Sequence, residues 1–384
     1  MGKYRIAYAT GSRADYGIVR HYLEKLNQDE DIDLEILVTG ALLSKEYGHQ
    51  VDLIVNDKFV IGAKIELPID TTSNAGILHV MSVALDKFGS LFEAQKYDLL
   101  ILLGDRYEIL SVALAASMQK IPILHLHGGE ATFANYDEFI RHSITKMSRF
   151  HITATQEYRH RVIQLGEDPK NVYHLGALGA ENCMDIDESQ VPDMIKDLQP
   201  KSYAVVLFHP ETLSNINPFY QIQELLKALD HNRNIRYVFL GANADTYSHE
   251  IRQAVKQYVE KYKEDLYYEN LHTDAYHYLV KNSAFLIGNS SSGIIEAPSL
   301  GVRTINIGDR QKGRVRGNSV MDVSCSAPLI SKSIRICLKN KIERIMNPYY
   351  QKDSCNQYYL ITKQFLEESV SFNFIPKTFY DINF

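Results

Sequence analysis

Carboxylates and histidines that could transfer protons recur at a few points of this 384-residue sequence. Several of them directly follow short apolar runs, and each run has the length of a buried strand. Carboxyl groups that lie close together in a partly dry site can have raised pKa values, which suits general acid and base catalysis. The candidate catalytic residues on this reasoning are Asp105, Glu130, Asp137, His209 and His127.

Each of these residues also has an ordinary structural reading. A single acidic residue after a strand is more often a helix cap or a salt-bridge partner than a catalyst. Asp137, for example, could cap its helix and pair with Arg141 one turn later. The catalytic reading therefore depends on the candidates coming together in space.

A second chemistry, anion binding, is indicated by residues 288–293, which read Gly-Asn-Ser-Ser-Ser-Gly. Glycines and serines at a helix start leave backbone N–H groups free for an anion, and the helix dipole assists them. Ser290 and Ser291 would face such an anion, and Glu296 could accept hydrogen bonds from ribose hydroxyls. Simple helix capping explains the same spacing equally well.

Arginines at two further points could bind a phosphate. Residues 11–17 contain glycines around Arg13, whose guanidinium can form paired hydrogen bonds with phosphate oxygens. Arg310 begins a basic stretch with Lys312, Arg314 and Arg316. This stretch is either a solvated loop or a phosphate clamp, and its position directly after a strand favours the clamp.

Other reaction classes lose support because their motifs are missing. The sequence has no G-x-G-x-x-G fingerprint, no phosphate-binding G-x-x-x-x-G-K-[ST] loop and no G-x-S-x-G nucleophile turn. His125, His127 and Glu130 could ligate a metal, but neither H-E-x-x-H nor H-x-x-E-H is present. We therefore expect no metal, and dinucleotide-dependent oxidoreduction and NTP hydrolysis lose support.

The elements that must position these residues alternate along the chain. Apolar strand patterns occur at residues 5–10, 34–39, 99–103, 121–126, 151–154, 172–175, 204–208, 237–240, 266–268, 285–287 and 304–307. Helical patterns occur at 16–27, 76–94, 107–118, 137–148, 218–229, 249–262 and 356–369. Strands that are apolar on both faces and separated by helices predict an α/β protein with parallel sheets covered on both sides.

Two such series predict two doubly wound Rossmann-like domains, since 384 residues exceed the size of one growing core. The expected domains are residues 1–181, residues 182–364, and a C-terminal helix and tail, 365–384, that returns to the first domain. One large sheet with a surface excursion is the alternative. Because ligands bind outside the carboxyl ends of parallel strands, the polar clusters predict a cleft between the two domains.

The composition of the chain argues against some classes of binding partner. The formal charge of −6 offers no surplus of basic groups for a phosphate polymer, so nucleic acid is not expected. The longest strongly apolar run, 99–103, is far shorter than the roughly 20 residues of a membrane span. The four cysteines have no metal-site spacing and are expected to be reduced thiols in a cytoplasmic protein.

Taken together, the motifs resemble those of the hydrolysing UDP-N-acetylglucosamine 2-epimerases, in particular the bacterial sialic-acid (capsule) branch. The resemblance runs from about residue 3 to residue 370. The segments that carry it are residues 11–17, 104–108, 125–130, 135–142, 289–293 and 308–314. It implies a GT-B-type architecture and a UDP-sugar held between two Rossmann-like halves, with no metal or nicotinamide.

The resemblance also implies roles for individual positions. Those that match nucleotide-binding or substrate-binding positions of the family are Arg13, Ala14, Arg106, Asn243, Ser290, Ser291, Glu296 and Arg310. Asp105, Asp137 and His209 match catalytic positions. One departure concerns His127, because many relatives carry a glutamate there, and its role must then pass to Glu130, to His127 or to neither.

The implied reaction begins with elimination of UDP from UDP-N-acetylglucosamine and ends with hydration of the resulting glycal. The products would be UDP and N-acetylmannosamine, which feeds sialic acid synthesis. The alternatives are a hydrolysing 2-epimerase of UDP-N,N'-diacetylbacillosamine and a non-hydrolysing UDP-N-acetylglucosamine 2-epimerase. Relatives are commonly dimers or tetramers, so a homodimer or homotetramer is expected.

Overall fold

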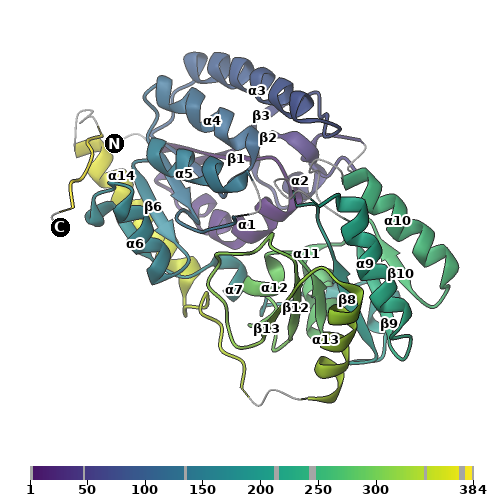
Figure 1. The fold of residues 1–384 in the computed structure, drawn as a ribbon. Coiled ribbons are helices and arrows are strands. Elements are labelled where there is room, and N and C mark those ends of the chain that lie inside the picture. The colour runs from purple at the N-terminus through teal and green to yellow at the C-terminus, as the bar shows by residue number, and fades with distance from the viewer. Residues whose placement is uncertain are drawn as a thin grey trace. The chain divides into compact units, whose positions relative to one another are not determined.

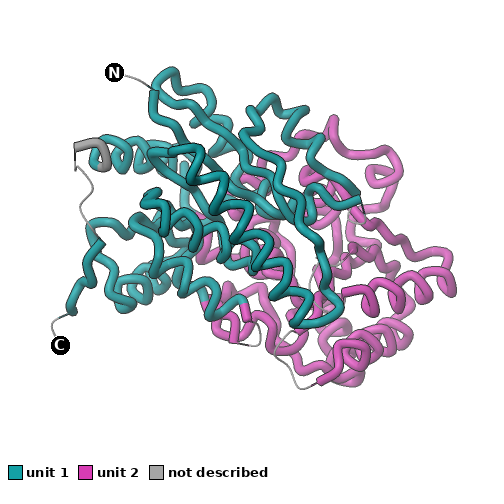
Figure 2. The backbone as a smooth tube through the Cα atoms, turned by 90° about the horizontal axis from the view of Figure 1, so that it is seen from above, with its two compact units in different colours: residues 1–130, 137–178, 351–384 teal, residues 131–136, 179–350 magenta. Residues whose placement is uncertain are grey.

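The computed structural model describes residues 3–45, 48–133, 136–211, 216–241, 248–340, 344–371 and 377–382. The chain divides into two compact units, which Figure 2 shows in different colours. Unit 1 comprises residues 1–130, 137–178 and 351–384, and unit 2 comprises residues 131–136 and 179–350. Each unit contains its own sheet, so the alternative of one large sheet is wrong.

Unit 1 is built on a seven-stranded sheet in the order β3-β2-β1-β4-β5-β6-β7, and all of its strand pairs are parallel. The strands are β1 (Tyr4–Thr10), β2 (Ile32–Thr39), β3 (Val60–Ile65), β4 (Leu99–Leu103), β5 (Ile123–Leu126), β6 (Phe150–Thr153) and β7 (Val172–His174). All five residues of the central strand β4 are buried, because helices cover both faces of the sheet.

The helices of unit 1 connect successive strands, except for the last one, which lies near the C-terminus of the chain (Figure 1). They are α1 (Arg13–Asn27), α2 (Asp52–Asn56), α3 (Asn74–Ala94), α4 (Tyr107–Met118), α5 (Asp137–Met147), α6 (Gln156–Gln164) and α14 (Ser354–Ser371). Strand–helix–strand alternation with parallel pairing is the doubly wound arrangement that the sequence predicts.

The C-terminal helix α14 packs into the core of unit 1. Phe365 stacks on Phe150 of β6 with ring centroids 4.1 Å apart, and Tyr358 meets Tyr22 of α1 edge to face. After this helix, Lys377 donates hydrogen bonds to the carbonyls of Lys146 and Ser148 at the end of α5. The described C-terminal residues, 351–371 and 377–382, are therefore part of the first unit's structure.

Unit 2 contains a six-stranded parallel sheet in the order β10-β9-β8-β11-β12-β13. Its strands are β8 (Tyr203–Leu207), β9 (Arg236–Leu240), β10 (Leu266–Tyr268), β11 (Leu286–Gly288), β12 (Thr304–Ile307) and β13 (Val320–Val323). Its helices are α7 (Leu178–Asn182), which begins at the junction, α8 (Asp193–Lys196), α9 (Pro218–Asp230), α10 (Ser248–Lys261), α11 (Thr273–Asn282), α12 (Ser292–Ile295) and α13 (Ala327–Lys339).

The sequence missed two strands, and both lie at sheet edges. β3 carries a glycine and only one of its residues is fully buried, and β13 has no fully buried residue. An edge strand lacks the continuous apolar run by which a central parallel strand is recognised. All eleven strands predicted from the sequence correspond to strands of the structure.

Helix α3 is long and apolar enough to cross a membrane by length and mean hydropathy alone. In the structure it lies along α4, with Phe88 and Phe92 buried, and 33% of its apolar window is buried. The core helix of a soluble protein can meet the same criteria of length and hydropathy. Because α3 packs against α4, we describe it as part of the fold of unit 1.

Candidate functional site

Strands β1, β4 and β5 are neighbours in the parallel sheet of unit 1, so the segments that follow them leave from the same edge. Glycine and left-handed residues make the turns there: Gly104 has φ of +76°, His127 +63° and Gly129 +79°. A left-handed φ in a non-glycine residue such as His127 is uncommon and often marks a functional position.

Arg141 of α5 joins three of the acidic residues at this edge. It is fully buried, and its Nη2 pairs with Asp105 Oδ2. Its Nη1 lies 3.2 Å from Glu138 Oε2 and donates to the Glu130 carbonyl oxygen at 2.9 Å. A buried guanidinium that binds several oxygens fixes the direction of these groups.

Asp137 is the first residue of α5, in the helix turn where an acidic residue is favoured. One turn later on the same helix, Arg141 connects Asp105, Glu138 and the backbone of Glu130. Asp137 therefore lies beside the cluster on the same helix.

His127 and Glu130 form a second contact of unit 1. His127 Nδ1 lies 3.7 Å from Glu130 Oε1, and both residues are buried. The structure thus brings together the two residues between which the sequence could not choose. A buried histidine beside a carboxylate can hold or pass a proton.

Both ring nitrogens of His125 lie within hydrogen-bonding distance of neighbouring groups. Its Nε2 lies 2.8 Å from the Gly104 carbonyl oxygen and its Nδ1 lies 3.0 Å from the Thr145 hydroxyl. Burial lowers the pKa of His125 to about 3, so the ring is neutral at physiological pH. It holds the turn that carries Asp105 in place.

Arg106 is held by Glu108, which is 1% exposed: Arg106 Nε donates to Glu108 Oε1 at 2.6 Å. This carboxylate also fills the space beside Gly11, where an added Cβ would lie 2.4 Å from Oε1. The glycine after β1 is therefore required by the close approach of Glu108.

Arg13 and Ala14 are the first two residues of α1, and Ser12 caps this helix by accepting a hydrogen bond from the Asp15 N–H. Ala14 is exposed and Arg13 is half-buried. The N-terminus of this 15-residue helix, at the carboxyl end of β1, is a suitable place for an anionic group.

Asp15, two residues into α1, has an inaccessible Oδ2 with no hydrogen-bond partner. Burial raises the pKa of Asp15 to about 6, although Arg106 and Ser12 oppose the rise. Such an environment is typical of functional carboxyl groups and also of strained structural ones.

In unit 2, Asn289 links the ends of β8 and β11. Its side chain accepts from the His209 N–H at 2.7 Å and donates to the His209 carbonyl at 2.8 Å. Asn289 is fully buried and His209 is 3% exposed. The position of His209 is therefore set by a two-point amide contact.

Glu211 links the ends of β8 and β12. Its Oε1 accepts from the N–H groups of Asp309 and Arg310, at 2.8 and 3.1 Å. At Gly308, with φ of +76°, an added Cβ would lie 2.3 Å from that oxygen. Arg310 then reaches the Asn289 carbonyl oxygen with its Nη1 at 3.3 Å.

Ser290 and Ser291 precede α12, which has only four residues. The helix dipole expected from the sequence is therefore that of a single turn. The Ser290 hydroxyl accepts from the Ser292 N–H at 3.4 Å, and Ser291 at the N-cap makes no side-chain capping bond. Both serines are half-exposed and lie next to Asn289.

Glu296 is the C-cap residue of α12 and belongs to a chain of hydrogen bonds. The Ser292 hydroxyl donates to Glu296 Oε2, and Ser292 also contacts the Tyr276 hydroxyl. Burial alone would raise the pKa of Glu296, but the hydrogen bonds of His277 and Ser292 and the charge of His277 lower it. Glu296 thus stays ionised and can accept further hydrogen bonds.

The basic residues that follow β12 have different partners in the structure. Arg316 pairs with Asp322 at 2.9 Å, and Lys312 lies 3.5 Å from Asp309. Arg310 is the member whose side chain extends to the end of β11. Arg310 is therefore the residue of this stretch that we favour as a phosphate ligand.

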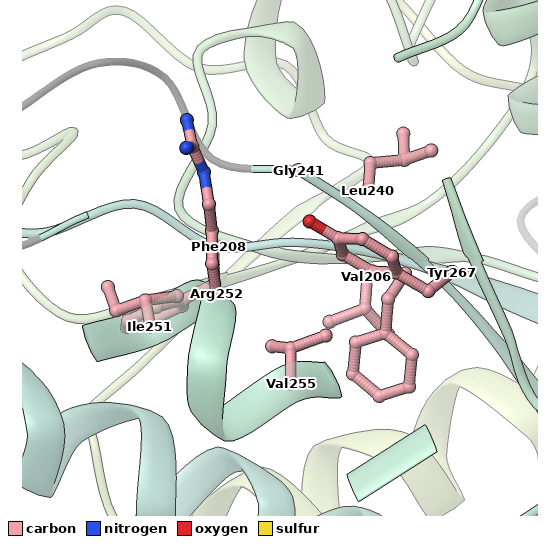
Figure 3. A pocket seen from close by; sticks show the side chains of 9 residues that line it. Val206, Phe208, Leu240, Gly241, Ile251, Arg252, Val255 and Tyr267 are labelled. Atoms are coloured by element: carbon pink, nitrogen blue, oxygen red, sulfur yellow. The ribbon is translucent and has the colours of Figure 1, made fainter. Parts of the chain in front are cut away.

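A small hollow of about 10 Å³ lies at the ends of β8 and β9 (Figure 3). It is lined by apolar side chains and by Arg252, which pairs with Glu269 at 3.2 Å. This volume holds about one water molecule. Asn243, which follows β9 in the sequence, lies outside the described residues.

Within the residues that the structure describes, no group of three or more His, Cys, Asp or Glu side chains is arranged to hold a metal ion.

The sequence analysis did not select three residues that organise these positions: Arg141, Asn289 and Glu211. Each is polar and buried. Asn289 directly follows β11, and Glu211 lies a few residues after the end of β8. Their burial, which distinguishes them from capping residues, is decided by tertiary packing.

Comparison with known proteins gives consistent results. The model of the family described as UDP-N-acetylglucosamine 2-epimerase matches residues 24–362. The chain is 47% identical over 385 residues to polysialic acid biosynthesis protein P7 of Escherichia coli, covering 98% of this chain and 97% of that protein. It is 37% identical to the hydrolysing GDP/UDP-N,N'-diacetylbacillosamine 2-epimerase of Campylobacter jejuni, covering 84% of this chain and 85% of that protein.

Among solved structures, the Neisseria meningitidis UDP-GlcNAc 2-epimerase bound to UDP-GlcNAc superposes with a TM-score of 0.77 at 16% identity. The match covers 94% of this chain and 100% of that one. At this identity the likeness establishes the fold, two Rossmann-like domains of GT-B type.

Proposed function

The chain belongs to the UDP-N-acetylglucosamine 2-epimerase family, and we propose that it is a hydrolysing member that converts UDP-N-acetylglucosamine and water into N-acetylmannosamine and UDP. The observation that carries the choice within the family is the 47% identity, over nearly the whole of both chains, to a polysialic acid biosynthesis protein. Synthesis of a sialic acid requires free N-acetylmannosamine, which the hydrolysing reaction provides.

The reaction has two stages. A base removes the proton from carbon 2 while the bond between carbon 1 and the UDP oxygen breaks, which leaves a glycal. Water then adds a hydroxyl to carbon 1, and an acid delivers a proton to the opposite face of carbon 2. The protein must supply a base, an acid and charge stabilisation for the departing diphosphate.

Unit 1 has the groups for the proton transfers. Asp105 is the proposed base, and its pairing with Arg141 fixes the direction of its carboxylate. Glu130 and His127, 3.7 Å apart, can hold the proton that returns to carbon 2, and Asp137 is the alternative acid. Arg141 is a positioning residue in this scheme.

Unit 2 has the groups for the leaving UDP. Ser290, Ser291 and Arg310 are the proposed diphosphate ligands, Glu296 the ribose ligand, and His209 the group that polarises the leaving oxygen. Arg13, Ala14, Arg106 and Asn243 are proposed to contribute to nucleotide binding. The cleft between the domains that the sequence suggests stays a prediction.

The reaction in deuterated water tests this function. Proton NMR of a reaction started with UDP-N-acetylglucosamine is expected to show UDP, N-acetylmannosamine and deuterium at carbon 2. Formation of UDP-N-acetylmannosamine without free UDP would instead identify a non-hydrolysing epimerase.

The substitution Asp105→Asn tests the proposed base. We expect loss of turnover with retained UDP binding, because the carboxylate acts on the sugar and not on the nucleotide. Exposed Asp33→Asn serves as the control. Near-normal release of N-acetylmannosamine by the Asp105 variant would remove this residue from the mechanism.

A second substrate is favoured by one observation, the 37% identity to a diacetylbacillosamine 2-epimerase. One or two contacts in a sugar pocket can change specificity between such substrates. Parallel assays with the two nucleotide sugars distinguish them, and we expect the larger kcat/KM for UDP-N-acetylglucosamine.

We further propose that the enzyme works in the cytoplasm, where nucleotide sugars are made, and that it assembles as a homodimer or homotetramer. Residues 1–181 would serve the sugar, residues 182–364 the UDP, and residues 365–384 would support the first domain.

A further inference from the structure

Residues 377–382, near the end of the chain, dock on the two helices that flank β6 in unit 1. The Tyr380 N–H donates to the Gly166 carbonyl oxygen, just after α6, at 3.0 Å. The Phe379 ring lies against the same glycine, where an added Cβ would lie 2.2 Å from a ring carbon. The ammonium of Lys146, in the last turn of α5, lies 4.6 Å from the centroid of this ring. The segment therefore has its own docking contacts, separate from those of α14.

Lys377 begins this docked segment and caps the C-terminal end of α5. Its Nζ donates to the carbonyl oxygens of Lys146 and Ser148 at 2.7 and 2.6 Å, and to that of Thr145 at 3.4 Å. The last carbonyls of a helix have no partner within the helix, and positive charge beside them is favourable. An ammonium that comes from a distant part of the sequence therefore helps to fix the position of this helix end.

A buried carboxylate holds the ammonium in place. Glu167 Oε2 lies 2.7 Å from Lys377 Nζ and 3.1 Å from His151 Nε2, and Glu167 Oε1 lies 2.9 Å from Lys146 Nζ. Because a buried carboxylate that loses a partner is strongly destabilised, this cluster favours a single position of the Lys377 side chain.

Helix α5 connects this capped end to the candidate catalytic residues. Arg141 and Thr145 are one turn apart on the same face of the helix, and both are fully buried. Arg141 pairs with Asp105, the proposed base, whereas the Thr145 carbonyl oxygen faces Lys377. A displacement of the last turn of α5 would therefore reach Arg141 and, through it, Asp105.

Thr145 provides a second connection to the same carboxylate. Its hydroxyl lies 3.0 Å from His125 Nδ1, and His125 Nε2 lies 2.8 Å from the Gly104 carbonyl oxygen. Since the buried ring is neutral and a carbonyl oxygen can only accept, Nε2 carries the hydrogen and Nδ1 accepts from Thr145. Gly104 directly precedes Asp105, so this chain of hydrogen bonds also ends at the proposed base.

We propose that Lys377 is a positioning residue for the reaction, because by capping α5 it holds Arg141 and Asp105 in their catalytic arrangement. This inference rests on the proposed function, in which Asp105 is the base. The alternative is that the C-terminal segment only adds stability to unit 1. A positioning role affects turnover more than substrate binding, since the nucleotide is assigned mainly to unit 2.

The substitution Lys377→Met tests the role, because methionine fills similar space but cannot donate to the carbonyls. We expect kcat for release of UDP from UDP-N-acetylglucosamine to fall about 10-fold, with KM changed less than about twofold, since small displacements of a catalytic group have effects of this kind. Lys363→Met is the matched control. Lys363 lies on α14, is 28% exposed against 25% for Lys377, and pairs with Asp29 at 2.8 Å. This variant should keep the kcat of the wild type.

The conservative variant Lys377→Arg gives a readout in pH. Burial lowers the pKa of Lys377 to about 8, the charges of Lys146 and Arg149 act in the same direction, and Glu167 opposes them. Burial also lowers the pKa of His151, so this neighbour is neutral above pH 7. Lysine therefore loses its charge between pH 7 and pH 9, whereas arginine stays charged. We expect near wild-type kcat in Lys377→Arg at pH 7, and a several-fold rise in its ratio to the wild-type kcat at pH 9.

Amide hydrogen exchange provides a measurement that needs no substrate. Residues 137–148 are expected to exchange faster in Lys377→Met than in the wild type or in Lys363→Met. If circular dichroism shows Lys377→Met to be unfolded, the pH dependence of Lys377→Arg decides the matter.

Three outcomes would overturn the proposal: wild-type kcat in folded Lys377→Met, an equal loss of kcat in Lys363→Met, or a kcat ratio of Lys377→Arg to wild type that does not change with pH. Each of these requires an active wild type. A wild type that releases no UDP from UDP-N-acetylglucosamine would contradict the proposed function instead, so the two failures are distinct.

Discussion

At the scale of single residues, the arrangement depends on buried polar side chains that each fix several groups. Arg141 is paired with Asp105 and Glu138 and also binds the Glu130 carbonyl, and Asn289 binds His209 through both of its amide atoms. Because a buried polar group that loses its partner is strongly destabilising, these contacts hold a single geometry.

Arg141→Lys tests this positioning role. A lysine keeps the charge but cannot reach three acceptors with a planar fork, so Asp105 loses its fixed direction. We expect kcat to fall about 100-fold with little change in KM, since small displacements of a catalytic group have effects of that size. The measurement is steady-state release of UDP.

The half-exposed Arg20→Lys, whose arginine pairs with Glu24 and Asp57, is the control and should leave kcat unchanged. Wild-type turnover in Arg141→Lys would show that the buried arginine is only structural.

Asp15 leads to a prediction on pH. Its pKa is about 6 in the folded chain against an ordinary value of 3.8, so the folded state holds this proton more tightly. Stability must therefore fall as pH rises from about 4 to 6, and the loss, about 3 kcal/mol at most, is complete above pH 6. Asp15→Asn removes the loss.

The measurement is the unfolding free energy of wild type and Asp15→Asn at pH 4 and pH 7. The variant should be the more stable at pH 7, by about 1–3 kcal/mol, with a smaller difference at pH 4. Equal differences at the two pH values would mean that Asp15 does not titrate as described.

At the scale of elements, the C-terminal helix α14 is a structural part of unit 1. It contributes Tyr358, Phe365 and Leu366 to the core, each 1% exposed or less. The turns after strands depend in a similar way on glycine. Gly288 has φ of +148°, and an added Cβ there would lie 1.9 Å from the Leu207 carbonyl oxygen. Such elements specify how the strand ends are arranged.

Two substitutions within α14 test its contribution. Phe365→Ala removes a ring stacked on Phe150, and we expect a loss of about 3–5 kcal/mol in unfolding free energy. Leu360→Ala, at a position 48% exposed on the same helix, should change it by less than about 0.5 kcal/mol. Similar losses for both in urea unfolding would contradict the packing of this helix.

At the scale of the whole molecule, the proposed function assigns different chemistry to the two Rossmann-like units. Carboxylates and a buried arginine occupy the strand ends of unit 1, and serines, Arg310 and His209 occupy those of unit 2. This division suits a reaction in which one part transfers protons and the other holds a leaving nucleotide.

UDP should therefore stabilise the protein through unit 2. At 100 times its dissociation constant, UDP is expected to add about 2.7 kcal/mol of stability, seen as a rise of several degrees in melting temperature. Arg310→Met should reduce this rise and Asp105→Asn should preserve it. The reverse pattern in a thermal unfolding assay would contradict the proposed division.

The sequence by itself determined the fold class and the place of most candidates, because apolar parallel strands are easily recognised and polar residues directly follow them. The edge strands β3 and β13 could not be recognised from the sequence, because partly exposed strands lack a continuous apolar run. Only the tertiary structure decided that Arg141 binds Asp105, that Asn289 holds His209 and that α12 is a single turn. Those facts depend on burial and on contacts between distant segments, which local sequence patterns do not encode.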